Sequence, residues 1–195
     1  MLSDKEIFQL AKMMNIPLEF CNYKDKLPQK LELNKGYIIN MQSSTEDEDG
    51  SHWTCFISVD YPLMKTVHSY YFDSFGQPPP EIVNDRIMNN YGHKPKYNTK
   101  DIQSLIADCC GYYALAFLYW ITVYESTSGE LYKDAKEFES LFDDLNKSRD
   151  FKKNEYVLQL FFRPASKELR DKYPINLDSV KIHQTVPIDE LDSLH

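Results

Sequence analysis

Apolar and polar positions recur along the chain with two different periods, and each period predicts a different kind of element. Apolar residues at helical spacing predict helices over residues 3–15, 81–90 and 130–146. Alternating or short apolar runs bounded by turn residues predict strands over residues 36–41, 53–59, 67–72 and 156–162. The run from Tyr112 to Tyr124 is apolar on all sides, which predicts a helix buried from every direction.

The order of these elements predicts an α+β fold. We expect a mixed, mostly antiparallel sheet packed around the buried central helix. Residues 19–35 show no clear period, with a turn near Asp25 to Pro28, and residues 94–99 read as extended chain. No repeat or linker divides the chain, so we expect a single domain over residues 1–195, with about the last ten residues loose.

Composition narrows the classes of partner. With 195 residues and 42% hydrophobic positions, the chain can bury a substantial core. Its net charge of −8 disfavours nucleic-acid binding, although a local basic patch around Arg86, His93, Lys94, Lys96 and Lys100 stays open as an alternative. The uncharged run from Cys109 to Tyr124 is shorter than the ~20 residues that cross a bilayer, so no membrane is expected. The acidic stretch from Ser43 to Ser51 is typical of a solvated loop.

The four cysteines point to a reducing, intracellular compartment. They are Cys21, Cys55, Cys109 and Cys110, and none belongs to a C-x-x-C pair or to a His/Cys cluster with zinc spacing. We therefore expect neither a disulfide framework nor a metal, and no cofactor.

Cys110 is the candidate nucleophile. It stands just ahead of the apolar run, and a helix N-terminus lowers the pKa of a thiol. Gly111 follows it and admits a close approach of substrate backbone, whereas Cys109 lacks a following glycine and ranks second. Cys55, inside a strand, and Cys21 read as small buried side chains.

Three further residues supply the other groups that thiol catalysis needs. His52 opens one predicted strand and Asp73 closes the next, so an antiparallel pair brings them to the same sheet edge. Asp73 would orient the imidazole of His52, which serves as the base. Gln103, seven positions before Cys110, can donate an amide N–H to a developing oxyanion.

In combination these blocks resemble a known family. His52-Trp53, Phe72-Asp73-Ser74-Phe75-Gly76, Gln103 and Cys110-Gly111 are similar, in that order, to the cysteine proteases related to adenain and to the ubiquitin-like-protein-specific proteases. The seven-residue step from Gln103 to Cys110 matches the adenain branch, and small maturation proteases of virophages and Polinton-like elements are the nearest type. Asp73 stands where adenain has a longer acid, as in the ubiquitin-like branch.

The resemblance implies an adenain-like fold with Cys110 as nucleophile, His52 as base, Asp73 as its orienting acid and Gln103 as oxyanion donor. Trp53 would flank a narrow substrate channel beside Gly111, and cleavage would fall at glycine-containing sites. The expected activity is that of a monomeric cysteine endopeptidase, found in the virion and the host cytoplasm, which processes capsid or other virion precursors. A ubiquitin- or SUMO-directed protease, and an inactive virion binding protein, are the alternatives.

Overall fold

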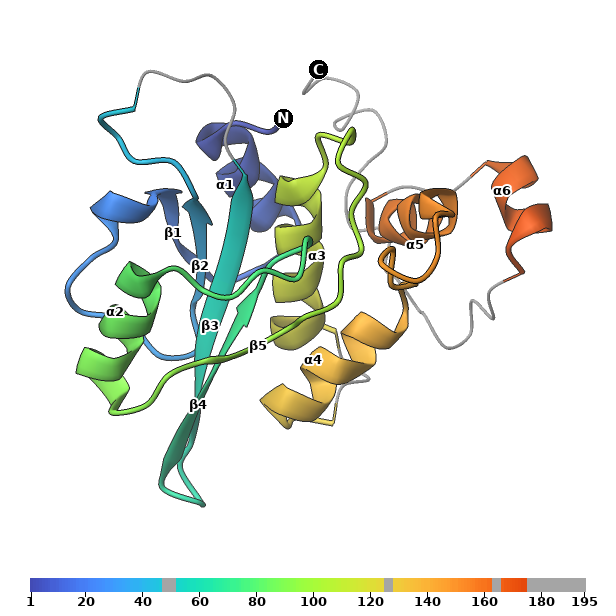
Figure 1. The fold of residues 1–195 in the computed structure, drawn as a ribbon. Helices are drawn as coiled ribbons and strands as arrows, with labels where there is room; N and C mark the ends of the chain where they lie inside the picture. The colour runs from blue at the N-terminus through green and yellow to red at the C-terminus, as the bar shows by residue number, and fades with distance from the viewer. Residues whose placement is uncertain (47–51, 125–127, 163–165, 175–195) are drawn as a thin grey trace.

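The computed structural model describes residues 1–46, 52–124, 128–162 and 166–174 (Figure 1). The helices in these ranges are α1 (Asp4–Met13), α2 (Glu81–Tyr91), α3 (Cys110–Thr122), α4 (Leu131–Ser140), α5 (Phe151–Phe162) and α6 (Lys167–Lys172), with a 3₁₀ turn η1 (Lys24–Lys26). The strands are β1 (Leu18–Tyr23), β2 (Gly36–Asn40), β3 (Trp53–Tyr61), β4 (Thr66–Phe72) and β5 (Lys96–Tyr97). The expected α+β class is confirmed.

The strands described here form one mixed sheet in the order β1-β2-β3-β4-β5. The two inner pairings, β2 with β3 and β3 with β4, are antiparallel, whereas each edge strand pairs in parallel with its neighbour. Half of the strand pairings in this sheet are therefore parallel, whereas the sequence predicted a mostly antiparallel sheet. Both parallel partners are edge strands, and β5 is only two residues long, so neither carries a strong period of its own.

Apolar side chains cover both faces of the sheet, because successive residues of a strand point to opposite sides. Ile38, Cys55, Ile57 and Phe72 belong to the larger core, which α1, α3, α4 and α5 complete. The residues that point to the other face belong to a smaller core under α2. They are Tyr37, Ile39, Phe56 and Tyr71. Figure 1 shows α2 and α3 on opposite sides of the sheet. This double cover explains why the side chains of β2 are all buried.

Helix α3 is buried as its composition predicts. It packs on β3 and contacts α1, α4 and α5, and its residues Leu115 to Phe117 are fully inaccessible. Ring contacts between Phe72 and Phe117, at a centroid distance of 4.7 Å, join the helix to the sheet. The helix begins at Cys110, two residues earlier than the start of the apolar run.

Two helix ends carry well-defined caps. Ser3 caps α1 in a capping box, since its hydroxyl accepts from the backbone N–H of Glu6 and the Glu6 carboxylate accepts from the backbone N–H of Ser3. Gly92 ends α2 with a positive φ of 77°.

The predicted strand over residues 156–162 is wrong, because this segment is the second half of α5. The buried side chains Asn154, Val157, Leu158 and Phe161 recur at helical intervals, and Phe161 lies against the rings of Tyr119 and Trp120 in α3. A run of apolar residues alone does not distinguish a strand from a buried helix. The polar residues that begin α5 complete the helical period.

Other boundaries shift in smaller ways. The predicted helix over residues 130–146 ends at Ser140, and β1 falls in the stretch that showed no period. Most of the acidic part of the Ser43–Ser51 loop and the last ten residues lie outside the described residues. None of the helices in the described part is long and apolar enough to cross a bilayer.

The turn after β4 needs a glycine at position 76. Gly76 has a φ of +68°, and its backbone N–H donates to the carbonyl of Asp73 at 2.8 Å. A Cβ atom there would lie 2.7 Å from the carbonyl carbon of Thr99 and 2.9 Å from that of Lys100. Since both neighbours are backbone atoms, they cannot turn aside as a flexible side chain would.

We expect Gly76→Ala to lower the free energy of unfolding by about 2–4 kcal/mol, since it adds this clash to the strain of a positive φ. Gly92→Ala is the matched control, because Gly92 has a similar φ but nothing within 4 Å of the added Cβ, and we expect a loss of about 1 kcal/mol. Urea denaturation of both variants measures the difference. Equal losses would show that the close contact between Gly76 and the backbone of Thr99 and Lys100 does not affect stability.

Candidate active site

The structure brings His52 and Asp73 together at one end of the paired strands β3 and β4. His52 immediately precedes β3 and Asp73 immediately follows β4, and these strands are antiparallel with Cys55 opposite Phe72. The Nε2 atom of His52 lies 2.8 Å from Oδ1 of Asp73. The Asp73 side chain is only 1% exposed, so this hydrogen bond forms away from bulk water.

Asp73 is held rigidly around this bond. Its Oδ1 also accepts from the backbone N–H of Phe75 at 2.7 Å, and the ring of Phe75 lies against the His52 ring at a centroid distance of 4.6 Å. The Asn98 side chain binds the backbone of Asp73 twice. Its Oδ1 accepts from the Asp73 N–H at 2.9 Å, and its Nδ2 donates to the Asp73 carbonyl at 2.5 Å. Asn98 is fully buried. The sequence did not predict its contact with Asp73, because a single asparagine carries no pattern.

Cys110 completes the group as the first residue of α3. Its Sγ accepts a hydrogen bond from the backbone N–H of Trp53, the residue next to His52, at 3.4 Å. Both this N–H group and the helix N-terminus favour negative charge on the sulfur. The side chains of three predicted catalytic residues, which lie far apart in the sequence, are therefore gathered at one point.

The pKa of His52 reflects its two partners. Burial lowers the pKa, but hydrogen bonding and Coulomb attraction to Asp73 and to Cys110 outweigh it and raise the pKa from 6.5 to about 9. The ring is therefore favoured in its charged form at neutral pH. An imidazolium between a carboxylate and a thiol is the arrangement that stabilises a thiolate.

The proximity of His52 distinguishes Cys110 from the other three thiols. Desolvation raises the pKa of Cys109 to about 12, and it raises the pKa of Cys21 and of Cys55 as well. These three cysteines are held as neutral thiols, while Cys110 alone stands beside His52. Cys109, the second candidate, is placed as the N-cap residue of α3.

Gln103 lies in the loop between β5 and α3. Its side chain is 3% exposed, and its Nε2 donates to the backbone carbonyl of Ala107 at 2.6 Å. The amide thus contacts the segment that leads directly into Cys110, and its role as an oxyanion donor stays a prediction.

The two predicted substrate-binding residues are both in contact with the N-terminal segment. Trp53 is 6% exposed, and its indole N–H donates to the Leu2 carbonyl at 2.9 Å. A Cβ on Gly111 would lie 3.3 Å from the Leu2 side chain and 3.4 Å from that of Ile7. The small size of Gly111 therefore admits the N-terminal segment, and a contact with substrate stays a prediction for both residues.

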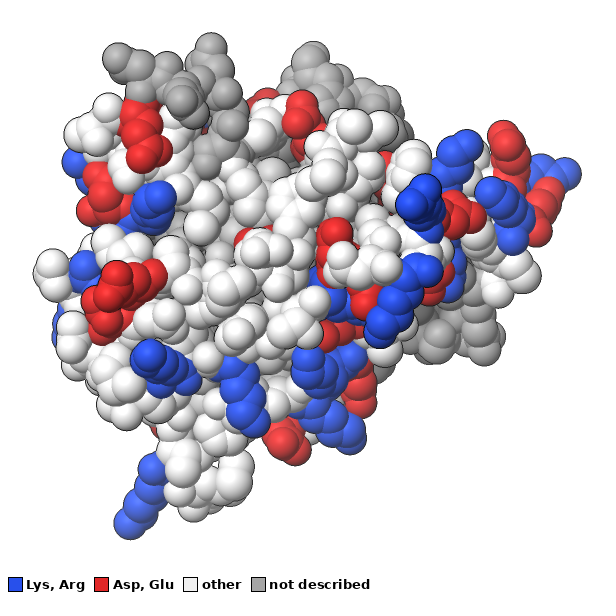
Figure 2. All heavy atoms as spheres, viewed as in Figure 1, with Lys and Arg blue, Asp and Glu red and all other residues white. Residues whose placement is uncertain are grey.

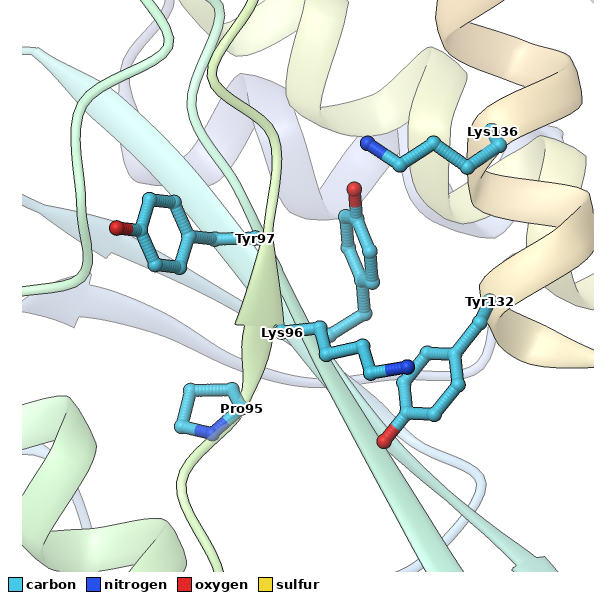
Figure 3. A pocket seen from close by; sticks show the side chains of 6 residues that line it. Pro95, Lys96, Tyr97, Tyr132 and Lys136 are labelled. Carbon is cyan, nitrogen blue, oxygen red and sulfur yellow. The ribbon is translucent and has the colours of Figure 1, made fainter.

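A surface pocket of about 430 Å³ lies elsewhere, between β5 and α4 (Figure 3). Several of its polar groups already have partners in the protein. The Lys96 ammonium lies 3.8 Å from the centre of the Tyr132 ring, and Glu139 binds both the Lys136 ammonium and the Tyr70 hydroxyl. None of the four predicted catalytic residues lines this pocket.

The candidate basic patch does not assemble as one exposed surface. Lys100 donates inward to the backbone carbonyls of Glu139 and Phe142, and His93 bonds to Ser69, whereas Lys94 and Lys96 are exposed. On the face in Figure 2, blue side chains are spread across the lower part of the molecule, and red side chains lie beside them toward the right. No group of three or more potential metal ligands occurs among the described residues.

Comparison of the chain with family models and with curated proteins gave no match. The resemblance to adenain-related proteases therefore depends on the sequence blocks quoted above.

The raised pKa of His52 predicts a pH dependence of stability. Folded His52 keeps its proton up to about pH 9, whereas in the unfolded chain it loses the proton near pH 6.5. The contribution of the ion pair is thus fully present below pH 6.5 and is lost as the pH rises to about 9. We expect His52→Ala to remove on the order of 2 kcal/mol at pH 6.5 and much less at pH 9.

Urea denaturation of both proteins at the two pH values measures this change. His93→Ala is the control, because the His93 ring bonds to a hydroxyl and a backbone carbonyl instead of a carboxylate. A difference between wild type and His52→Ala that stays constant with pH would contradict the assignment.

Proposed function

We propose that this chain is a cysteine endopeptidase that processes virion precursor proteins, with Cys110 as its nucleophile. The observation that carries the proposal is the hydrogen bond between His52 and Asp73 beside the Cys110 thiol. A buried carboxylate, an imidazole and a thiol at a helix N-terminus form the set of groups that thiol-dependent acyl transfer requires.

In the proposed reaction the Cys110 thiolate attacks the carbonyl carbon of the scissile peptide bond. The carbonyl oxygen becomes an oxyanion, which the Gln103 amide and the backbone N–H of Cys110 stabilise. The His52 imidazolium then gives its proton to the leaving nitrogen, and the C–N bond breaks to leave a thioester. Neutral His52 then takes a proton from water, the resulting hydroxide attacks the thioester, and the carboxylic acid product leaves, which restores the Cys110 thiolate and the His52 imidazolium.

An exposed apolar pair next to the site favours a polypeptide substrate. Leu105 and Ile106 lie in the loop between Gln103 and Cys110, and they are 86% and 87% exposed. Large apolar side chains so exposed beside a candidate nucleophile are suited to binding apolar side chains of an extended chain. Small polar substrates would gain nothing from such a surface.

The virion precursor is proposed as substrate because of the sequence blocks, in particular the seven-residue step from Gln103 to Cys110. A protease of ubiquitin or SUMO conjugates is the second candidate. Asp73 favours it, since an aspartate at this position is typical of that branch, and Asp73 is the partner of His52 in the structure.

We expect the wild-type protein to cleave capsid precursors encoded with it, or internally quenched peptides with glycine at the scissile bond. Cys110→Ala should abolish cleavage, because no other described thiol stands beside an imidazole of raised pKa. Cys109→Ala is the matched control and should retain most of the activity. Mass spectrometry of the products measures both.

Cleavage by Cys110→Ala at the wild-type rate, or no cleavage by the wild type, would overturn the proposal. Labelling of Cys110 by an electrophilic ubiquitin or SUMO probe, without precursor cleavage, would favour the second candidate. Slow and uniform alkylation of all four cysteines would favour an inactive binding protein.

The apolar pair supplies a separate prediction. Replacing both Leu105 and Ile106 by serine should raise KM about tenfold, since about 1–2 kcal/mol of apolar contact with substrate is lost, while kcat changes little. Steady-state kinetics on a cleaved peptide measures this.

Leu63→Ser combined with Met64→Ser is the control, because these residues are also large, apolar and exposed but lie at the turn between β3 and β4. A similar rise in KM in both double variants, or in neither, would show that the Leu105–Ile106 pair does not bind substrate.

A further inference from the structure

Ser74 makes a contact that the reaction outlined above leaves unused. It follows Asp73 directly, it is 1% exposed, and its hydroxyl donates to Oε1 of Gln103 at 2.7 Å. A buried serine hydroxyl that binds a candidate oxyanion donor is in a position to control that donor.

The partners of Gln103 determine which way its amide faces. The Ala107 carbonyl can only accept a hydrogen bond, so the amide atom 2.6 Å from it must be the NH₂ group. The other amide atom is then Oε1, and Ser74 must donate to it. A reversed amide would set two acceptors against each other at Ala107.

The backbone of Ser74 holds the same loop. Its carbonyl accepts from the backbone N–H groups of Ile102 at 2.8 Å and of Gln103 at 3.2 Å. Ser74 therefore binds both the main chain and the side chain of the segment that carries the amide. Together with Asp73, it makes one turn responsible for orienting both the base and the amide.

We propose that Ser74 is a positioning residue that keeps the Nε2 atom of Gln103 directed toward the oxyanion. This inference rests on the proposed function. The NH₂ group has two hydrogens, and its one bond among the described residues goes to Ala107. The second hydrogen is available to a substrate oxyanion. While that hydrogen binds the oxyanion, the hydrogen bond from the Ser74 hydroxyl to Oε1 prevents the amide from rotating.

The role predicts a particular kinetic pattern for Ser74→Ala. Because an oxyanion forms only in the transition state, we expect kcat to fall about 10- to 100-fold with KM nearly unchanged. Alkylation of Cys110 by iodoacetamide should keep its wild-type rate, since displacement of iodide forms no oxyanion. Gln103→Ala should show the same pattern with a larger loss, about 100- to 1,000-fold.

A double-mutant cycle tests whether Ser74 acts through Gln103. In the Gln103→Ala background, Ser74→Ala should cause little further loss of kcat, because no amide remains to be oriented. Additive losses, or an unchanged kcat in Ser74→Ala, would overturn the inference. A parallel loss of iodoacetamide reactivity would instead assign Ser74 a merely structural role.

Ser58→Ala is the matched control. Its hydroxyl makes a buried hydrogen bond of the same length, 2.7 Å, to Ser69 within the sheet, so this variant loses a comparable bond away from the site. We expect its kcat to stay near the wild-type value.

Ser74→Cys is the fallback should Ser74→Ala fail to fold. Its thiol has a similar shape and is only a weak donor, so kcat should lie between the wild type and Ser74→Ala, and a wild-type kcat would contradict the inference. A wild type that cleaves nothing would overturn the proposed function itself. An active wild type with an unaffected Ser74→Ala would overturn this inference alone.

Discussion

The antiparallel pairing of β3 with β4 is the constraint on which the candidate site depends. It brings the residue before β3 and the residue after β4 to the same end of the strand pair, where Nε2 of His52 lies 2.8 Å from Oδ1 of Asp73. The same pairing buries apolar residues on both faces, which anchors α2 on one side and α3 on the other. Because α3 packs on β3, its first residue, Cys110, lies beside the N–H group of Trp53.

A second constraint is the contact between two connecting segments. The turn that follows β4 and the loop that follows β5 bind each other through the Asn98 side chain, the Ser74 carbonyl and the close approach of Gly76 to Thr99. These contacts use backbone groups that would otherwise be buried without partners. The acid and the amide are thus parts of one rigid unit, which suits a site whose geometry must be set before substrate arrives.

Polar neighbours distinguish Cys110, the candidate nucleophile, from the other three cysteines. Desolvation raises the pKa of Cys21, Cys55 and Cys109, because a thiolate is unfavourable in an apolar environment. Cys110 is buried too, but it faces a charged imidazole and a backbone donor. The chemical character of each cysteine therefore depends on its polar neighbours more than on its exposure.

The sequence by itself determined the local features of this protein. Helix α1 begins at its Ser3 cap and α2 ends at Gly92, the central strands follow their apolar pattern, and Cys110, His52, Asp73 and Gln103 could be selected by type and order. Only the tertiary structure decided that residues 156–162 are helical, that both edge strands pair in parallel, that Asn98 binds Asp73, and that Ser74 binds Gln103. The physical reason is that periodicity and capping are local, whereas strand pairing and buried hydrogen bonds join residues far apart in the chain, and nothing in the neighbouring sequence records such a partner.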